Sequence, residues 1–403
     1  MKIIFYLCLF SMIIGPLGLL PLGITAVNIY LIDVLAGSLF FFHFTRVQKT
    51  LKFVKTDAIS LYFLGFTALC LISLLFSPIN LSLTEKIISG LYLVRLVSYF
   101  SIYLTTKQLI KAKEISASSI LKSLIITSLI IAVFGWLQYF LYPNLRNLYY
   151  LGWDPHFKRI FSTFLDPNYL GLILVLALIA IYGSWDKKRG NGLIFFASFI
   201  FMTLMFTYSR SSFLSITLAV IYLAIQKRKL KFAIFITLLI FFSAILLPRP
   251  KGGVGVQLER IFSIETRIGN WQQAFKIFTD HPILGIGFNA TRYAKMQYNI
   301  PQDNLSSNHA GAGFDNSFLF VAATTGLLGL LSYLFFLRQV FRLSNLWVKA
   351  SFVAIIIHSF FLNSLFFPWV MMWMWILLAT GPAARVSQTP LQNRSTIRGA
   401  QGQ

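Results

Sequence analysis

The sequence predicts an all-α integral membrane protein with about twelve transmembrane helices. The chain is 57% hydrophobic and only 12% charged, whereas about a quarter of an average soluble domain is charged. Apolar stretches of roughly 20 residues, the length that crosses a bilayer, follow one another with short polar breaks. The first stretch has no small-residue cleavage site, so we interpret it as a retained helix.

The apolar stretches and their polar breaks define the candidate spans in order. These are residues 3–20, 24–44, 57–77, 84–106, 117–142, 166–184, 191–208, 210–226, 230–247, 314–337, 344–366 and 367–381. Together they predict one polytopic membrane domain over residues 1–381. Residues 382–403 are polar and hold too little apolar surface to fold, so we expect a disordered cytoplasmic tail. We detect no internal repeat.

The basic residues indicate how the spans are oriented. The chain has 35 Lys and Arg against 12 Asp and Glu, a net charge of +23. Such a charge in a soluble protein suggests a nucleic-acid partner, but here the cations are dispersed among short loops without a continuous basic face. With the spans above, the basic groups fall on one side, which the positive-inside rule makes the cytoplasm, together with both termini. These groups lie within 46–55, 107–113, 187–189, 227–231, 338–342 and 385–398.

Two loops on the opposite face, about 143–165 and 248–313, are long and also carry cations. The positive-inside rule expects cations in cytoplasmic loops, so it does not explain the cations of these two loops. They therefore predict an anionic ligand outside the cytoplasm. Apolar side chains at helical spacing predict an amphipathic helix in the larger loop, on the membrane surface or the outer face of the protein. They are Ile268, Trp271, Phe275 and Phe278.

Two arginines near the outer face are candidates for binding this ligand. Arg210 interrupts two apolar runs, and a charge at such a depth is costly enough to suggest a function. The alternative, that Arg210 reaches the lipid headgroups from a hairpin turn, stays open. Arg267 would lie in the first turn of the amphipathic helix, where the helix dipole disfavours a cation, so a ligand explains it better.

The acidic and histidine candidates have structural alternatives. Asp166 precedes Pro167, as expected for a helix N-cap, and we favour that interpretation. Asp315 could cap the span that follows it or act as a general base, and both possibilities stay open. His309 is an isolated loop histidine with no second ligand at metal-binding spacing, so no metal site is predicted.

Polar residues within the spans are expected to have structural roles. Asp33 and Arg95 fall at similar depths in two spans and are predicted to form an ion pair. His358 is interpreted as an interhelical hydrogen-bonding residue. Cys8 and Cys70 lie in apolar runs and are expected to be packing residues.

Four segments carry a resemblance to a known family. Residues 159–171, 207–210, 267–287 and 315–329 occur in this order around the large outer loop. In this arrangement they resemble the bacterial O-antigen ligase and O-antigen polymerase superfamily. The similarity covers about 160–330 in motif detail and the rest of the chain only by span number and loop placement.

The resemblance implies a glycosyltransferase of the bacterial inner membrane with its active site facing the periplasm. A glycan on undecaprenyl diphosphate would be transferred to a hydroxyl of lipid A-core, in a ligase, or of a lipid-linked repeat unit, in a polymerase. No metal or other cofactor is implied. Arg210 and Arg267 match the diphosphate-binding arginines of the family, whose planar groups suit bidentate phosphate contact.

The base implied by the resemblance is Asp315 or, if the loop folds back, His309. Many ligases have His-Asn where this chain has Asp315-Asn316, a difference that favours a polymerase or another surface-polysaccharide transferase. Further residues in or near the motifs are candidates for binding the diphosphate or other parts of the substrate. They are Lys158, Arg159, Asn168, Tyr208, Arg260 and Asn316.

A transporter or flippase of lipid-linked glycan is the alternative function. Such a protein also needs many spans and cations near the membrane. It should show repeat symmetry and short loops on both faces, and this sequence shows neither. We therefore favour the transferase.

Overall fold

The computed structural model describes residues 1–20, 27–151, 153–184, 190–259, 261–300 and 313–381. The predicted all-α class is confirmed over these ranges, with only a two-residue pairing of β1 (Leu19–Leu20) and antiparallel β2 (Ile29–Tyr30). The α-helices are α1 (Lys2–Ile14), α2 (Leu31–Phe44), α3 (Val47–Thr56), α4 (Ala58–Leu75), α5 (Leu83–Lys111), α6 (Ala117–Leu141), α7 (Pro167–Gly183), α8 (Gly190–Met205), α9 (Arg210–Lys227), α10 (Leu230–Leu246), α11 (Phe262–Asp280), α12 (Thr291–Gln297), α13 (Ser317–Leu343), α14 (Leu346–Ser359) and α15 (Pro368–Thr380). Short 3-10 turns are η1 (Gly15–Gly18), η2 (Arg146–Leu151), η3 (Ser162–Phe164), η5 (Val254–Val256) and η7 (Ser364–Phe366).

Every predicted span overlaps one of these helices, but the helices differ in length. Among the described residues, the 4 helices α4, α5, α6 and α13 are long and apolar enough to cross a membrane. The helices α1, α2, α7, α8, α10, α14 and α15 are apolar but shorter. A helix rises about 1.5 Å per residue, so the shorter helices would need flanking residues to cross. The number of crossings stays a prediction, and the predicted tail at 382–403 lies outside the described residues.

The first helix is shorter than its predicted span of 3–20. It ends because Gly15 adopts a positive φ of 62° and is followed by Pro16. A side chain at Gly15 would come within 2.8 Å of the Thr163 carbonyl oxygen. The chain therefore turns where it meets the segment that leads into α7.

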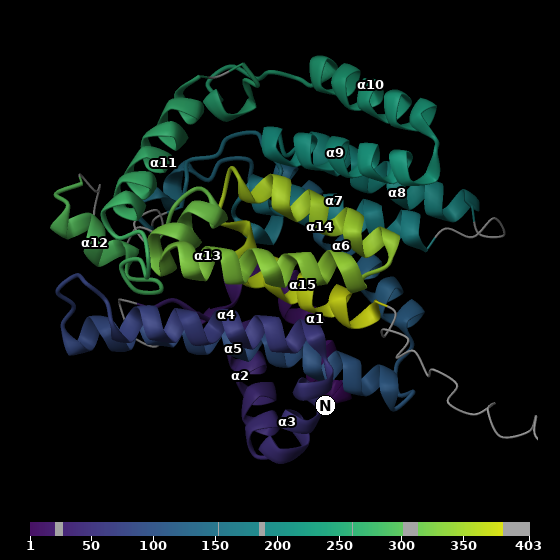
Figure 1. The fold of residues 1–403 in the computed structure, drawn as a ribbon. Coiled ribbons are helices and arrows are strands. Elements are labelled where there is room, and N and C mark those ends of the chain that lie inside the picture. Colours follow the sequence, from purple (N-terminus) through teal and green to yellow (C-terminus); the bar gives the residue numbers. More distant parts are fainter. Residues whose placement is uncertain (21–26, 152, 185–189, 260, 301–312, 382–403) are drawn as a thin grey trace, which may run out of the picture.

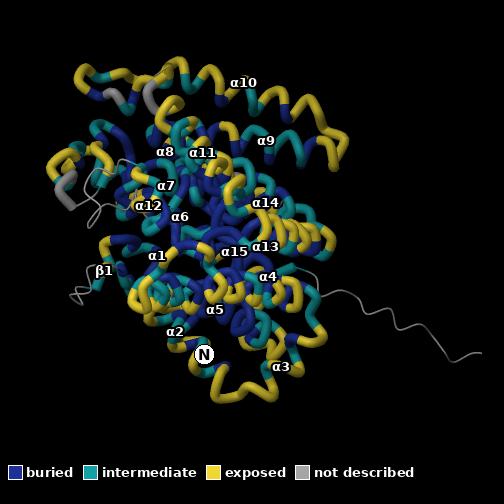
Figure 2. The backbone as a smooth tube through the Cα atoms, turned by 60° about the vertical axis from the view of Figure 1, so that its left-hand side comes forward, coloured by how far each residue is buried: buried dark blue, intermediate teal, exposed yellow. Residues whose placement is uncertain are grey.

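The centre of the helix bundle is α15. It packs against α5, α6 and α14, and its backbone is dark blue in Figure 2 because its residues are buried. Trp369, Trp373 and Trp375 are each at most 1% exposed. A helix that is apolar on all sides is stable only when other elements enclose it. Its 13 residues therefore form a protein core rather than a lipid-facing surface.

The outermost helix is α10, which lies beyond α9 at the top of Figure 1. It packs against α9 and α8. Much of its surface is apolar and exposed, including Ile234, Phe235, Phe241 and Leu246. An exposed apolar surface of this kind suits contact with lipid chains.

The two ends of the bundle differ. In Figure 1, α11 and α12 lie at the left-hand end, and the turns from α9 to α10 and from α13 to α14 lie at the right-hand end. The helix α11 occupies the segment for which an amphipathic helix was predicted. Ala274 and Ile277 on α11 are buried, whereas Ile268 and Phe275 are about half exposed, at 46% and 58%. The apolar face is therefore only partly covered by protein.

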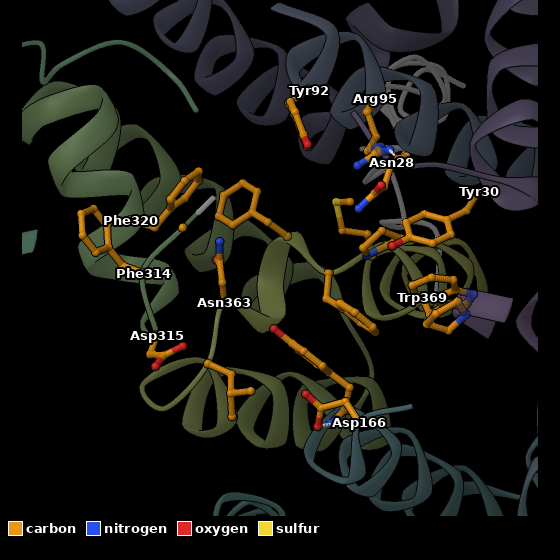
Figure 3. A pocket seen from close by; sticks show the side chains of 18 of the residues that line it. Asn28, Tyr30, Tyr92, Arg95, Asp166, Phe314, Asp315, Phe320, Asn363 and Trp369 are labelled. Atoms are coloured by element: carbon orange, nitrogen blue, oxygen red, sulfur yellow. Dashed lines mark hydrogen bonds between the residues drawn. The ribbon is translucent and has the colours of Figure 1, made fainter. Parts of the chain in front are cut away.

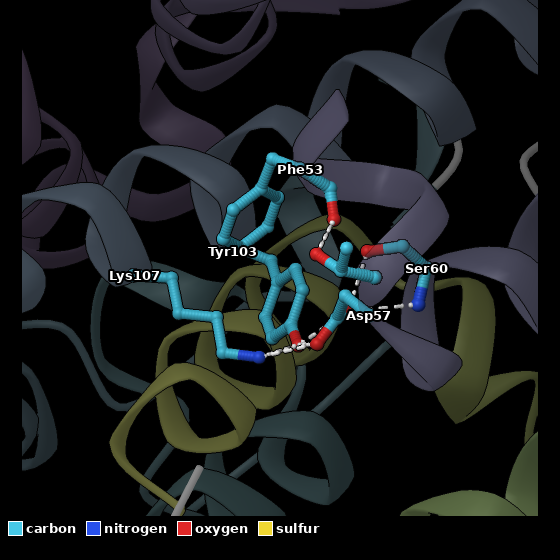
Figure 4. Close-up of polar contacts among 6 residues, drawn as sticks. Phe53, Asp57, Ser60, Tyr103 and Lys107 are labelled. Atoms are coloured by element: carbon cyan, nitrogen blue, oxygen red, sulfur yellow. Dashed lines mark hydrogen bonds and ion pairs between the residues drawn. The ribbon is translucent and has the colours of Figure 1, made fainter. Parts of the chain in front are cut away.

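The short helix α3 was not predicted, and a polar cluster joins it to its neighbours (Figure 4). Asp57 caps α4 by accepting a 2.9 Å hydrogen bond from the Ser60 amide. The Tyr103 hydroxyl and the Lys107 ammonium of α5 both donate to the Asp57 carboxylate. Burial raises the pKa of Asp57, but the bonds from Lys107 and Ser60 outweigh it, so this pKa lies below its ordinary value.

Replacing Asp57 with asparagine is expected to destabilise the protein by on the order of 2 kcal/mol at neutral pH, because Lys107 loses its partner. Because the pKa of Asp57 is lowered in the folded state, its carboxylate stabilises the fold fully above the unfolded-state pKa of about 3.9. This stabilisation is lost as the pH falls through the folded-state pKa. Thermal unfolding in detergent across this pH range measures the effect. The control is Glu259→Gln, which breaks the exposed Arg249–Glu259 pair and should cost less than about 1 kcal/mol. Equal melting temperatures for the two variants at pH 7 would contradict the prediction.

The helix α13 is interrupted at Gly326, where φ is 65° and ψ is −167°. The segment 282–287 lies against this break. The Ile286 and Gly287 amides donate to the Ala323 and Thr324 carbonyls at 3.0 Å, and the Leu327 amide donates to the Pro282 carbonyl at 2.7 Å. Two of the sequence motifs thus interlock through their backbones, which fixes the end of α11 against α13.

Alanine at Gly326 is expected to destabilise the protein by about 3 kcal/mol or more, since strain and steric overlap act together. The new Cβ would come within 2.2 Å of the Ile283 carbonyl oxygen, at a positive φ. The matched control is Gly269→Ala in α11, where nothing lies within 4 Å and where alanine should stabilise the helix by about 0.5–1 kcal/mol. Melting temperatures of the two purified variants should therefore move in opposite directions, and a Gly326 variant as stable as the parent would refute this account.

Candidate functional site

A cavity of about 490 Å³ lies between the bundle and the segments near α11 and α12. Figure 3 shows Asp166, Asp315 and Asn363 around it, with Arg95 and Trp369 farther along the wall. Much of the lining is aromatic, and Asp154 is a further acidic residue of the wall. The lining residues come from distant parts of the chain, so the cavity exists only in the folded protein.

Asp315 is held at the cavity by its main chain. Its amide donates to Asn270 Oδ1 at 2.8 Å, and its carbonyl accepts a 3.1 Å bond from Trp271 Nε1. Both partners belong to α11. The next residue, Asn316, caps α13 by accepting bonds from the Phe318 and Leu319 amides. Because Asn316 is the cap, Asp315 is not needed for that role and its carboxyl lines the cavity.

The surroundings of Asp315 both raise and lower its pKa. Burial raises the pKa of Asp315, Arg267 lowers it, Asp154 raises it and Lys295 lowers it, with a net increase above the ordinary value. A carboxylate with a raised pKa accepts a proton more readily than an ordinary one. The arrangement therefore suits a general base, although that role stays a prediction.

Asp166 and Asp154 add negative charge to the same cavity. The N-cap predicted for Asp166 is confirmed, since its Oδ1 accepts bonds from the Asn168 and Tyr169 amides at 2.6 and 3.4 Å. Burial, and then the charge of Asp154, raise the pKa of Asp166 to about 6. Asp154 was not among the predicted site residues, although an acid beside Trp153 in a mostly basic loop was a possible signal.

Arg267 and Arg210 lie close enough for their charges to interact. Arg267 is on α11, with its guanidinium 5.9 Å from the centre of the Phe361 ring. Arg210 is the first residue of α9, and its Nη1 donates to the Leu258 carbonyl at 3.0 Å. Two neighbouring guanidinium groups disfavour each other's charge, and an anion between them would relieve that repulsion. The charge of Arg267 thus interacts both with Arg210 and with Asp315.

Residues 193–334 match the family model described as O-antigen ligase. This segment is therefore similar to O-antigen ligases. The resemblance stated from the sequence is therefore confirmed for this part of the chain. No curated protein matches the chain.

The O-antigen ligase segment supplies only part of the cavity. Arg210, Arg267 and Asp315 lie within residues 193–334, whereas Asp154 and Asp166 precede this segment. The N-terminal helices also contribute Arg95, whose guanidinium pairs with Asp33 at 2.8 Å, as predicted. The cavity wall is thus completed by residues that precede the matched segment.

Arg159 and Tyr208 support the start of the O-antigen ligase segment's α9. Arg159 is 2% exposed, and its Nε donates to the Thr207 carbonyl at 2.8 Å. Tyr208 is fully buried, and its hydroxyl donates to the Pro248 carbonyl at 2.5 Å. Both residues thereby fix the turn that presents Arg210. Their direct contact with the substrate stays a prediction.

Of the remaining predicted site residues, the structure describes Asn168 and Lys158. The Asn168 carbonyl accepts a 3.2 Å bond from the Ser212 hydroxyl, which ties α7 to α9. The Lys158 ammonium lies 5.7 Å from the Tyr139 ring centre. His309 and Arg260 lie outside the described residues, so the alternative base has no structural test.

Two further expectations concern histidine and metal ions. The interhelical role predicted for His358 is confirmed, because its ring nitrogens lie 2.6 Å from the Ser364 hydroxyl and 3.1 Å from the Ser211 hydroxyl. Within the described ranges, no group of three His, Cys, Asp or Glu side chains could hold a metal ion. The expected independence from metal stays a prediction.

Proposed function

We propose that this protein transfers a glycan from undecaprenyl diphosphate to a sugar hydroxyl in the synthesis of lipopolysaccharide or another surface polysaccharide. Its place would be the bacterial inner membrane, with the cavity facing the periplasm. The O-antigen ligase segment supports this type of reaction. The observation that carries the proposal is that the charge of Arg267 interacts both with Arg210 and with Asp315, which lines the aromatic-walled cavity.

In the proposed reaction, Asp315 accepts the proton of the acceptor hydroxyl. The hydroxyl oxygen forms a bond to the anomeric carbon of the donor sugar, and the bond from that carbon to the diphosphate oxygen breaks. Negative charge then develops on the departing diphosphate, where Arg210 and Arg267 stabilise it by charge-assisted hydrogen bonds. This division of roles needs a base on one side of the anomeric carbon and cations on the other.

The cavity suits the acceptor. Sugar rings have apolar C–H faces and polar edges, and binding sites for small molecules combine apolar walls with a few well-placed polar groups. The wall here offers Tyr169, Phe314 and Trp369 as aromatic surfaces, and Asp154 and Asn363 as hydrogen-bonding groups. We propose that the acceptor saccharide, on lipid A-core or on a lipid-linked repeat unit, occupies this cavity.

Deleting the protein in its native host tests the function. Loss of all long chains from lipid A-core indicates a ligase, and cores bearing a single repeat unit indicate a polymerase. Unchanged surface glycan would overturn the proposal. Accumulation of lipid-linked glycan on the cytoplasmic leaflet would instead support the flippase alternative.

A further inference from the structure

Lys295 is a buried lysine that the proposed mechanism does not use. It lies on α12 and is only 4% exposed. Lysine is almost never fully buried unless its charge is compensated, because removing an ammonium group from water is costly. Its position therefore requires an explanation.

Lys295 contacts the two residues that precede Asp315. Its ammonium donates a 2.9 Å hydrogen bond to the Gly313 carbonyl and lies 4.8 Å from the centre of the Phe314 ring. Gly313, Phe314 and Asp315 all line the cavity. The α11 residues Asn270 and Trp271 hold the Asp315 main chain, so α12 and α11 secure adjacent parts of the same turn.

The charged groups near Asp315 come from several elements. Arg267 on α11 and Lys295 on α12 are cations, whereas Asp154 is an anion from the loop before η3. Tyr169 on α7 is also close enough to interact with the Asp315 charge. If the donor diphosphate neutralises Arg267, Lys295 is the cation among these groups that still favours the carboxylate over the carboxylic acid.

We propose that Lys295 is a positioning residue that holds the Gly313–Asp315 turn and keeps Asp315 ionised while the diphosphate occupies Arg267. This inference rests on the proposed role of Asp315 as the base. Burial lowers the pKa of Lys295 to about 8, and Asp315 opposes this effect. The ammonium is therefore mostly charged at neutral pH, as the proposed role requires.

The experiment measures the pH dependence of kcat for glycan transfer in proteoliposomes containing undecaprenyl-diphosphate glycan and an acceptor. Lys295→Met removes both the charge and the hydrogen bond, Lys295→Gln keeps a donor without the charge, and Lys295→Arg keeps the charge. The acidic limb of the kcat–pH profile should move to higher pH by about one unit in the Met and Gln variants. On that limb the rate should fall about tenfold, and it should recover at higher pH. The Arg variant should follow the parent profile.

A matched control is Lys276→Met. Lys276 lies on α11, and its ammonium is 5.7 Å from the Tyr298 ring centre, but the residue is exposed. Its removal should leave the profile unchanged. Melting temperatures identify any loss of folding, and Lys295→Gln, which keeps a donor for Gly313, should remain closer to the parent than Lys295→Met.

Two results would overturn the inference. One is a Lys295→Gln profile that coincides with the parent profile, and the other is an equal loss of rate at every pH, which indicates a structural role only. Failure of the proposed function is a separate result, because the parent protein would then transfer no glycan. Normal turnover by Asp315→Asn would show instead that Asp315 is not the base. With an inactive Asp315→Asn and an unshifted Lys295→Gln, the function would stand and the role of Lys295 would fall.

Discussion

Replacing Arg267 with alanine is expected to reduce glycan transfer by about 10²–10³-fold while leaving the protein folded. Loss of one preorganised group that stabilises developing negative charge typically costs this much in kcat. The Arg267 guanidinium lies over the Phe361 ring and interacts with the charges of Asp315 and Arg210. Its removal therefore takes away charge where the diphosphate is proposed to leave.

The measurement is turnover of undecaprenyl-diphosphate glycan by purified protein in proteoliposomes. Arg267→Lys should recover only part of the activity, because an ammonium group cannot make the bidentate phosphate contact of a guanidinium. Arg292→Ala on α12 is a control for loss of a cation from the same region, and its turnover should be close to normal. Full activity of Arg267→Ala would exclude Arg267 from the diphosphate site.

Replacing Asp315 with asparagine is expected to lower kcat by about 10²–10⁴-fold, the usual contribution of a general base. The substitution should preserve the fold, because the bonds from Asn270 and Trp271 involve only the Asp315 main chain. The α13 cap is also retained, since Asn316 provides it. A loss of rate can then be attributed to the missing carboxylate.

The assay should compare Asp315→Asn with Asp280→Asn. Asp280 accepts a 2.8 Å bond from the Tyr298 hydroxyl on the exposed side of α11, so its replacement should leave turnover nearly unchanged. For the parent protein, activity should fall as the pH drops through the raised pKa of Asp315, because the protonated acid cannot accept another proton. Normal turnover by Asp315→Asn would return Asp315 to a structural role.

Much of the helical architecture was predictable because it depends on local apolar runs. Each predicted span overlaps a helix, and the amphipathic spacing around Trp271 predicted α11. The residues that end a helix were harder to recognise from the sequence alone. Gly15 and Pro16 were present in the sequence, but the early end of α1 became clear only from the close approach of Thr163.

The candidate site was only partly predictable. Arg210 and Arg267 were identified as cations on the predicted outer face. In the structure the charge of Arg267 interacts with both Arg210 and Asp315. Asp154 and Lys295 were not identified as candidates for the site, because a loop acid and a loop lysine carry no periodic pattern. Their significance depends on burial and on neighbours from other parts of the chain.

The sequence by itself determined the all-α class, the order of the helices and the presence of cations in the two long loops, because hydrophobic length and charge are properties of short segments. Only the tertiary structure decided that Gly326 breaks α13 to receive segment 282–287. It also decided that Asn316, rather than Asp315, caps this helix. Backbone partners and the electrostatic surroundings of a carboxyl group arise from residues distant in sequence, so no local pattern specifies them.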